Sequence, residues 1–159
     1  MDNNSKIFLK PHHFLDIIKL YGLGLNFFVP DPRYGHNFYK VGNLILKNPQ
    51  IGIFLTTKAD DICKPCKFLK NGKCQDKMKN FINSSKEEWN QIIDKRILNN
   101  LNLDKGDSLT PFELCQLASR KLTPKIISKI WRERSEKGTK KRIKYLLKGL
   151  GKYIKKFSA

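Results

Sequence analysis

Three cysteines lie within a stretch of twelve residues near the middle of the chain, and their spacing is the strongest chemical signal in the sequence. Cys63 and Cys66 form a C-x-x-C pair, which lets one loop direct two sulfur atoms at a single ion. Asn71-Gly72 predicts a turn that returns Cys74 to that pair. A metal centre with three thiolate ligands is therefore favoured over a redox pair, a disulfide or structural thiols.

The fourth ligand of such a centre is left open by the residues. All three histidines of the chain fall in its first 36 positions, beside predicted helix starts and turns. Asp16 follows His12 by four residues, so the two side chains share one helix face. Cys115 lies on what reads as an apolar helix face, where a buried free cysteine is common. The candidates for the fourth ligand are Asp16, His12, His13, His36 and Cys115.

Two carboxylates precede the first thiol of the loop. Asp60 and Asp61 next to Cys63 would repel a thiolate unless a cation neutralised them. We expect them to form a polar pocket with His13 and His36, in which a histidine acts as general acid or base and the carboxylates orient it.

Two cofactors suit this set of side chains. Three cysteines on a [4Fe–4S] cluster leave one iron open to a small-molecule substrate, as in an enzyme. Three thiolates and a fourth side chain on zinc form a closed structural site. Thiolate ligands suit both metals, so the sequence does not choose between them.

The elements that must position these residues are short. A strand over 6–10 stops at Pro11, and a helix follows from His12 until Gly22 and Gly24 end it. The apolar run over 51–57 predicts a strand that pairs with the first one. The remaining predicted elements are helices over 36–46, 86–101 and 139–157, with further helix starts at Thr110-Pro111 and Thr123-Pro124. The pattern predicts an α+β, mostly helical domain with a small two-stranded sheet and a cysteine-rich metal loop.

The composition is that of an ordinary globular protein. The chain has 159 residues, of which 40% are hydrophobic and 29% charged, and we expect one domain over 1–159. No run of apolar residues is long enough to cross a bilayer. The first residues lack the apolar core of a signal peptide, so we expect a cytoplasmic protein.

Positive charge is concentrated at the C-terminal end. The net charge is +18, and residues 120–159 contain fifteen Lys or Arg and two Glu. We expect a basic helical extension over 120–159 that packs on the domain. Such a surface attracts polyanions. The alternative function is therefore a small zinc-knuckle module that contacts nucleic acid through this helix.

Four segments of the chain resemble one family. K-P-H-H-F-L-D at 10–16, Y-G-H at 34–36, the cysteine loop at 60–74 and L-N-L-D-K-G-D at 101–107 resemble domain-of-unknown-function family 1284, a group of small prokaryotic proteins. The resemblance implies an iron–sulphur cluster. It also implies a fourth thiolate at the position where this chain has Asp16, so that a carboxylate would replace it here. No activity is implied.

Overall fold

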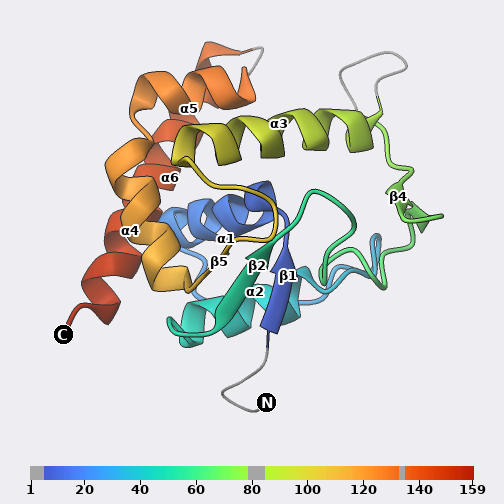
Figure 1. Ribbon diagram of the computed structural model, residues 1–159, viewed down its shortest axis with the longest axis horizontal. Helices are drawn as coiled ribbons and strands as arrows, with labels where there is room; N and C mark the ends of the chain where they lie inside the picture. The colour runs from blue at the N-terminus through green and yellow to red at the C-terminus, as the bar shows by residue number, and fades with distance from the viewer. Residues whose placement is uncertain (1–5, 79–84, 133–134) are drawn as a thin grey trace.

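A three-stranded sheet crosses the lower part of the molecule in Figure 1. The computed structural model describes residues 6–78, 85–132 and 135–159. Strands β1 (Lys6–Leu9) and β2 (Gly52–Leu55) are parallel, and the two-residue strand β5 (Ser108–Leu109) is antiparallel to β2. The predicted pairing of the first two strands is confirmed, and β5 is an addition that the sequence did not indicate.

Helices α1 (Pro11–Leu23) and α2 (Phe38–Lys47) connect the two parallel strands. Pro11 opens α1, and Gly24 ends it in a left-handed conformation with φ of 113°, which a residue without Cβ adopts at little cost. The second helix was predicted from residue 36 but begins at Phe38. His36 therefore lies in the loop before α2.

The other helices follow strong local capping signals. The segment before each helix supplies a hydroxyl that accepts a hydrogen bond from the first turn. Thr110 forms a full capping box with Glu113, as predicted. The last helix begins at Glu136, three residues earlier than predicted, because Ser135 caps it. These helices are α3 (Lys86–Leu101), α4 (Pro111–Lys121), α5 (Pro124–Trp131) and α6 (Glu136–Phe157).

Helix α1 lies in the middle of the molecule, with α3 above it in Figure 1 and the sheet and α2 below. Among the described helices, α1 and α6 make the most extensive contact. At their crossing, a Cβ on Gly22 would come within 2.0 Å of the Tyr145 carbonyl oxygen, and one on Gly149 within 2.0 Å of Ile18 O. Gly22 was predicted to help end α1, but it lies inside the helix and permits this close approach.

The hydrophobic core joins all of these elements into one α+β domain. Tyr153 of α6 is fully buried and donates a hydrogen bond of 2.6 Å from its hydroxyl to Ile45 O of α2. In the part of the chain that the structure describes, no helix has the length and apolar character of a membrane span. The described portion of the basic C-terminal segment thus contributes buried side chains to the same core as the sheet.

Candidate metal centre

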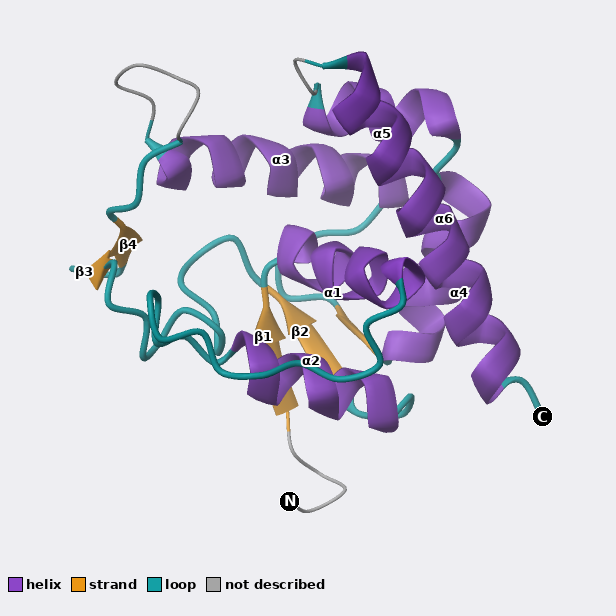
Figure 2. Ribbon diagram, turned by 180° about the vertical axis from the view of Figure 1, so that it is seen from behind, coloured by secondary structure: helices purple, strands orange, loops and turns teal. Residues whose placement is uncertain are grey.

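The cysteine loop ends in a small hairpin at one end of the molecule (Figure 2). Strands β3 (Leu69–Lys70) and β4 (Lys73–Cys74) pair through Asn71 and Gly72, whose φ angles are 52° and 74°. The predicted turn is confirmed. Glu87 of α3 fixes the hairpin, because its carboxylate accepts a hydrogen bond of 3.0 Å from Cys74 N.

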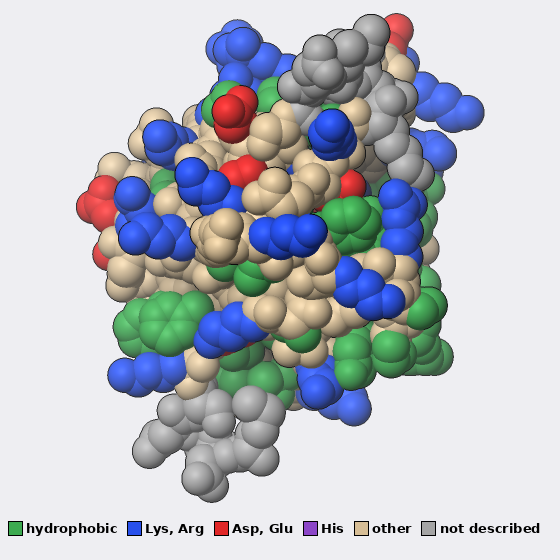
Figure 3. Space-filling view, turned by 90° about the vertical axis from the view of Figure 1, so that its right-hand side faces the viewer, with side chains coloured by type: hydrophobic (Ala, Val, Ile, Leu, Met, Phe, Trp, Pro, Cys, Tyr) green, Lys and Arg blue, Asp and Glu red, His purple; other side chains and the backbone are tan. Residues whose placement is uncertain are grey.

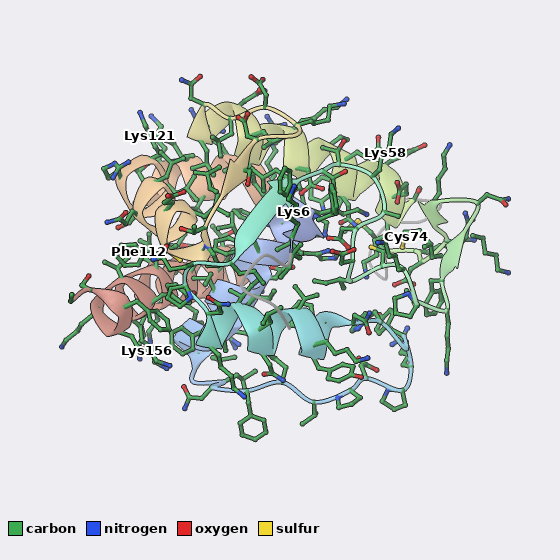
Figure 4. All side chains as sticks on the ribbon, turned by 60° about the horizontal axis from the view of Figure 1, so that its bottom comes forward. Lys6, Lys58, Cys74, Phe112, Lys121 and Lys156 are labelled. Atoms are coloured by element: carbon green, nitrogen blue, oxygen red, sulfur yellow. The ribbon has the colours of Figure 1, made fainter. Side chains whose placement is uncertain are left out.

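A pocket of about 270 Å³ opens between this loop and the first turn of α1. Sulfur atoms gather beside Cys74 in Figure 4, and all four cysteines of the chain are free thiols. Seven of the predicted site residues line the pocket, from three separate parts of the chain: His12, His13, Asp16, His36, Cys63, Cys66 and Cys74.

Asp60 lies behind the pocket and organises one side of it. Its carboxylate is fully buried, and Oδ2 accepts hydrogen bonds of 2.7 Å from Lys10 N and from Nδ1 of His13. Oδ1 accepts from the backbone N–H groups of Ile62 and Cys63 at 3.1 and 3.0 Å. These four donors tie the carboxylate to the cysteine loop and to the start of α1. Burial opposes ionisation, but His13 and these hydrogen bonds hold the pKa of Asp60 far below its ordinary value.

Asp94 of α3 plays the same part for the neighbouring histidine. One oxygen, Oδ1, accepts hydrogen bonds of 2.8 Å from both the backbone N and the ring Nδ1 of His12. Asp94 is fully buried, and its Oδ2 has no hydrogen-bond partner among the described residues. Two adjacent imidazoles are thus each held at Nδ1 by a buried carboxylate.

This arrangement leaves the second nitrogen of each ring for another ligand. The ring centroids of His12 and His13 lie 4.3 Å apart, and in the described part of the chain neither Nε2 makes a hydrogen bond. A carboxylate bound to one ring nitrogen fixes the tautomer and raises the basicity of the other, which is the usual support of a metal-binding histidine.

One group of side chains comes close enough to share an ion. Ligand atoms of His13, Asp60 and Cys63 lie within 4.8 Å of one another, so these residues could hold a metal ion. Within the described residues, the sulfur atoms of Cys63, Cys66 and Cys74 do not form a group of that kind. The three thiols therefore share a pocket while standing further apart than the His–Asp–Cys group.

The charges around Cys63 are of both signs. Burial and the neighbouring Asp60 raise the pKa of the Cys63 thiol to about 12. Lys10 lines the same pocket although only 2% of it is exposed. Burial opposes the charge of its ammonium, but the surrounding acidic groups, Cys63 and Glu87 foremost, together outweigh burial and raise the pKa of Lys10. A metal ion bound to Cys63 would stabilise its thiolate form.

The remaining predicted site residues lie apart from these groups. Asp16 lines the pocket but forms ion pairs with Arg142 at 3.3 Å and Lys19 at 3.8 Å. His36 stacks on Tyr34 with ring centroids 5.2 Å apart, and its Nδ1 is buried without a partner among the described residues. Asp61 does not line the pocket, because its carboxylate binds Lys64 and the backbone N of Phe8, both at 2.8 Å.

Cys115 is a core residue. It is fully buried on α4 and does not line the pocket, and burial raises the pKa of its thiol far above the ordinary value. The core interpretation of this cysteine agrees with the structure, and Cys115 drops out of the candidates for fourth ligand.

Sequence reasoning missed three residues that support the site. Lys10 lines the pocket, whereas Glu87 and Asp94 lie outside its lining and act through Cys74 N and His12. In the sequence, Glu87 appears only as an acid in the first turn of a helix and Asp94 only as a polar position within it. Asp94 interrupts the apolar side of α3, between Ile93 and Ile97. A charged residue on an otherwise buried helix face is the signal that could have identified it.

The fold and the pocket together define a small α+β protein with a cysteine- and histidine-lined candidate metal site. A family described as a protein of unknown function, DUF1284, matches residues 31–133. The chain belongs to this family. The matched region contains the cysteine loop, His36 and α3, and it excludes the His12–His13 pair and α6. Neither the curated proteins nor the solved structures contain a match to the chain.

Proposed function

We propose that this protein binds a metal centre through Cys63, Cys66 and Cys74, with His12 and His13 facing it. The observation that carries the proposal is the convergence of three thiols and two carboxylate-supported imidazoles on one pocket of about 270 Å³. Side chains of these types select soft or borderline metals such as zinc and iron.

The spacing of the thiols favours an iron–sulphur cluster over a single zinc ion. With a Zn–S bond of about 2.3 Å, the sulfurs of a tetrahedral site lie about 3.8 Å apart. The three sulfurs are not all within 4.8 Å of one another in the described chain. In a cluster each thiolate binds a different iron, so the ligands stand further apart. A [4Fe–4S] cluster with three thiolates is therefore the proposed cofactor, and zinc is the alternative.

His13 is the proposed acid–base group of the site, and Asp60 positions it. Bound on three thiolates, a [4Fe–4S] cluster would supply one open, Lewis-acidic iron for a small-molecule substrate. Nε2 of His13 can hold or deliver a proton there, because Asp60 fixes Nδ1. His12, supported by Asp94, is the proposed fourth ligand or second proton carrier. Asp16 is a weaker ligand candidate, since Arg142 and Lys19 already neutralise it.

Anaerobic purification with metal and sulfide analysis and a visible spectrum tests this proposal. We expect iron and sulfide in the wild type, with broad visible absorption, and loss of both in Cys63→Ser, Cys66→Ser and Cys74→Ser. Cys115→Ala is the matched control and should keep the cofactor. Stoichiometric zinc in a colourless protein would show that the cofactor is zinc and not an iron–sulphur cluster. A wild type that binds neither metal, or a triple Cys→Ser variant that still binds, would refute the proposal.

A second candidate function rests on the first turns of α6. A shallow hollow of about 500 Å³ lies there, and among the described residues its lining consists of Glu136, Tyr145 and four lysines, Lys137, Lys140, Lys141 and Lys144. This surface could hold the phosphates of a nucleic acid. Replacing Lys140 and Lys141 by Gln should then weaken binding of single-stranded RNA and reduce its salt dependence, whereas unchanged binding would exclude this surface.

A further inference from the structure

The last residue of α1 and the connection that follows it expose large apolar side chains at every second position. The apolar strip consists of Leu23, Leu25, Phe27 and Val29, which are 52%, 43%, 68% and 69% exposed. Burying one such side chain is worth about 1.5–3 kcal/mol, so leaving four in water is costly. Contiguous exposed apolar residues of this kind usually mark an interaction site.

The strip is held outward by a fixed backbone. Two hydrogen bonds to Asn43 fix the backbone at Phe28. Phe28 N donates to Asn43 Oδ1 at 2.7 Å, and Asn43 Nδ2 donates to Phe28 O at 2.9 Å. The Phe28 ring packs against Gly42 and Phe38. Figure 2 shows the connection crossing the outer side of α2. The neighbours of Phe28, Phe27 and Val29, are thereby turned to solvent.

Lysines flank the strip on both sides. Lys152 of α6 donates a hydrogen bond of 3.0 Å from Nζ to Asn26 Oδ1. On α2, the exposed Lys40 and Lys47 lie three residues before and four residues after Asn43, so they share the helix face that binds the strip. Asp31, two residues beyond Val29, is the nearest acid in the sequence, and its Oδ1 accepts from Arg33 N.

A hollow of about 540 Å³ between β1 and α2 continues this face. Ile7, Val41 and Leu44 form its apolar part, and Lys6, Lys40, Lys47 and Lys64 also line it. The carboxylate of Asp61, also in the lining, is already bound to Lys64 and Phe8 N. Lysines and exposed hydrophobic side chains also lie next to each other on the face shown in Figure 3.

We propose that the apolar strip and the lysines beside it dock on a membrane surface that contains anionic lipids. Phe27 and Val29 enter the boundary between headgroups and acyl chains, and the ammonium groups of Lys40 and Lys47 bind the phosphates. Amphipathic surfaces with this combination bind bilayers through buried apolar area and electrostatic attraction together.

The strip distinguishes a bilayer from other polyanions. Lysines and Phe27 alone would suit a nucleic acid, since bases stack on aromatic rings, but a nucleic acid offers no apolar phase to the aliphatic side chains of Leu25 and Val29. A protein partner of the same chemistry is the alternative occupant. The bilayer is favoured because the four apolar side chains protrude into solvent instead of lining a cleft, and because the charged side chains that flank them, Lys40, Lys47 and Lys152, are all positive. This proposal does not depend on the metal centre.

Vesicle flotation of the full-length protein tests the proposal. Wild type should bind phosphatidylcholine vesicles that contain phosphatidylglycerol and should not bind pure phosphatidylcholine vesicles. Phe27→Ser/Val29→Ser should lower the partition coefficient by about tenfold or more, and Lys40→Gln/Lys47→Gln by about fivefold per lysine. Ile92→Ser is the matched control, because Ile92 is 44% exposed on α3, and it should bind as wild type does.

Three outcomes would overturn the proposal. The first is an absence of binding to anionic vesicles. The second is equal binding by wild type and Phe27→Ser/Val29→Ser, which would reduce the interaction to nonspecific charge. The third is self-association in sedimentation velocity that the double variant abolishes, without vesicle binding, which would assign the strip to a protein interface. Thermal unfolding of each variant verifies that it is folded.

Discussion

The two ends of α1 are held in place by opposite kinds of chemistry. At the first turn, the buried carboxylates of Asp60 and Asp94 accept hydrogen bonds from Lys10 N and His12 N. At the last turn, Gly22 lies against α6 so closely that no side chain fits between the two helices. One end is a cluster of buried charges, and the other is a backbone-to-backbone contact.

The packed end of α1 contributes to stability, whereas its polar end also shapes the pocket. Buried charges cost desolvation free energy and are retained where they support a function. Close helix packing contributes dispersion and apolar burial without any polar group to satisfy. Substitutions at the packed end should therefore unfold the protein, and substitutions at the polar end should alter the pocket as well as stability.

The packed end gives the largest expected effect. Gly149→Leu would place its Cβ 2.0 Å from Ile18 O, and the backbone of α1 cannot move aside without separating the helices. We expect the free energy of unfolding to fall by about 4 kcal/mol or more, measured by urea denaturation. A variant as stable as wild type would contradict the close crossing of α1 and α6.

The polar end should respond less, and in a residue-specific way. Asp60→Ala leaves two buried and two partly buried donors without their acceptor and should cost about 3 kcal/mol in the free energy of unfolding. Asp61→Ala, its sequence neighbour, removes one exposed hydrogen bond and an ion pair with the exposed Lys64, so a clearly smaller loss is expected. Urea denaturation of the two variants measures the contrast, and equal losses would contradict the role of Asp60 as organiser of the loop.

We expect low pH to remove the contribution of Asp60 to the free energy of unfolding. The pKa of Asp60 is lower in the folded protein than in the unfolded chain, where it is about 4. Its stabilisation is therefore fully present above about pH 4 and is lost as the pH falls toward the folded value. Between about pH 6 and about pH 3, wild type should lose more unfolding free energy than Asp60→Asn, which has no carboxyl to titrate. Parallel losses in the two proteins would contradict this assignment.

The smallest expected effect is an increase in the free energy of unfolding. Gly151 lies on α6 two residues beyond Gly149, but it is exposed and a Cβ there would meet nothing within 4 Å. Gly151→Ala should raise the free energy of unfolding by about 0.5–1 kcal/mol, because alanine restricts the unfolded chain more than glycine does. Thermal melting of Gly151→Ala and Gly149→Leu compares an exposed and a packed glycine on the same helix. A lower melting temperature for Gly151→Ala than for wild type would contradict the prediction.

Local signals made part of this structure predictable. The capping residues Thr110 and Thr123 marked helix starts, since a cap acts within one turn. The turn at Asn71-Gly72 was predictable because both residues tolerate positive φ. The cysteine loop and the histidine pair were also identified from residue type and spacing, and both line the pocket.

Other features depend on distant parts of the chain, and the local sequence does not show which residues they join. Asp94 lies 82 residues from the histidine it supports, and nothing near it in the sequence indicates that pairing. The role of Gly22 depends on Gly149, so a glycine that resembles a helix terminator is a contact surface instead. Strand β5 has two residues, too few for a periodic pattern.

The pairing of α1 with α6 also constrains how the protein is made. The helix that carries His12 and His13 leaves the ribosome early, whereas α6, its most extensive helical partner among the described elements, is synthesised long after it. During that interval the side of α1 that α6 covers lacks this partner, although α3 can already pack against the helix. The described residues that line the pocket all precede α6 in the chain, but the helix that carries its two histidines gains its main packing partner only after α6 is made.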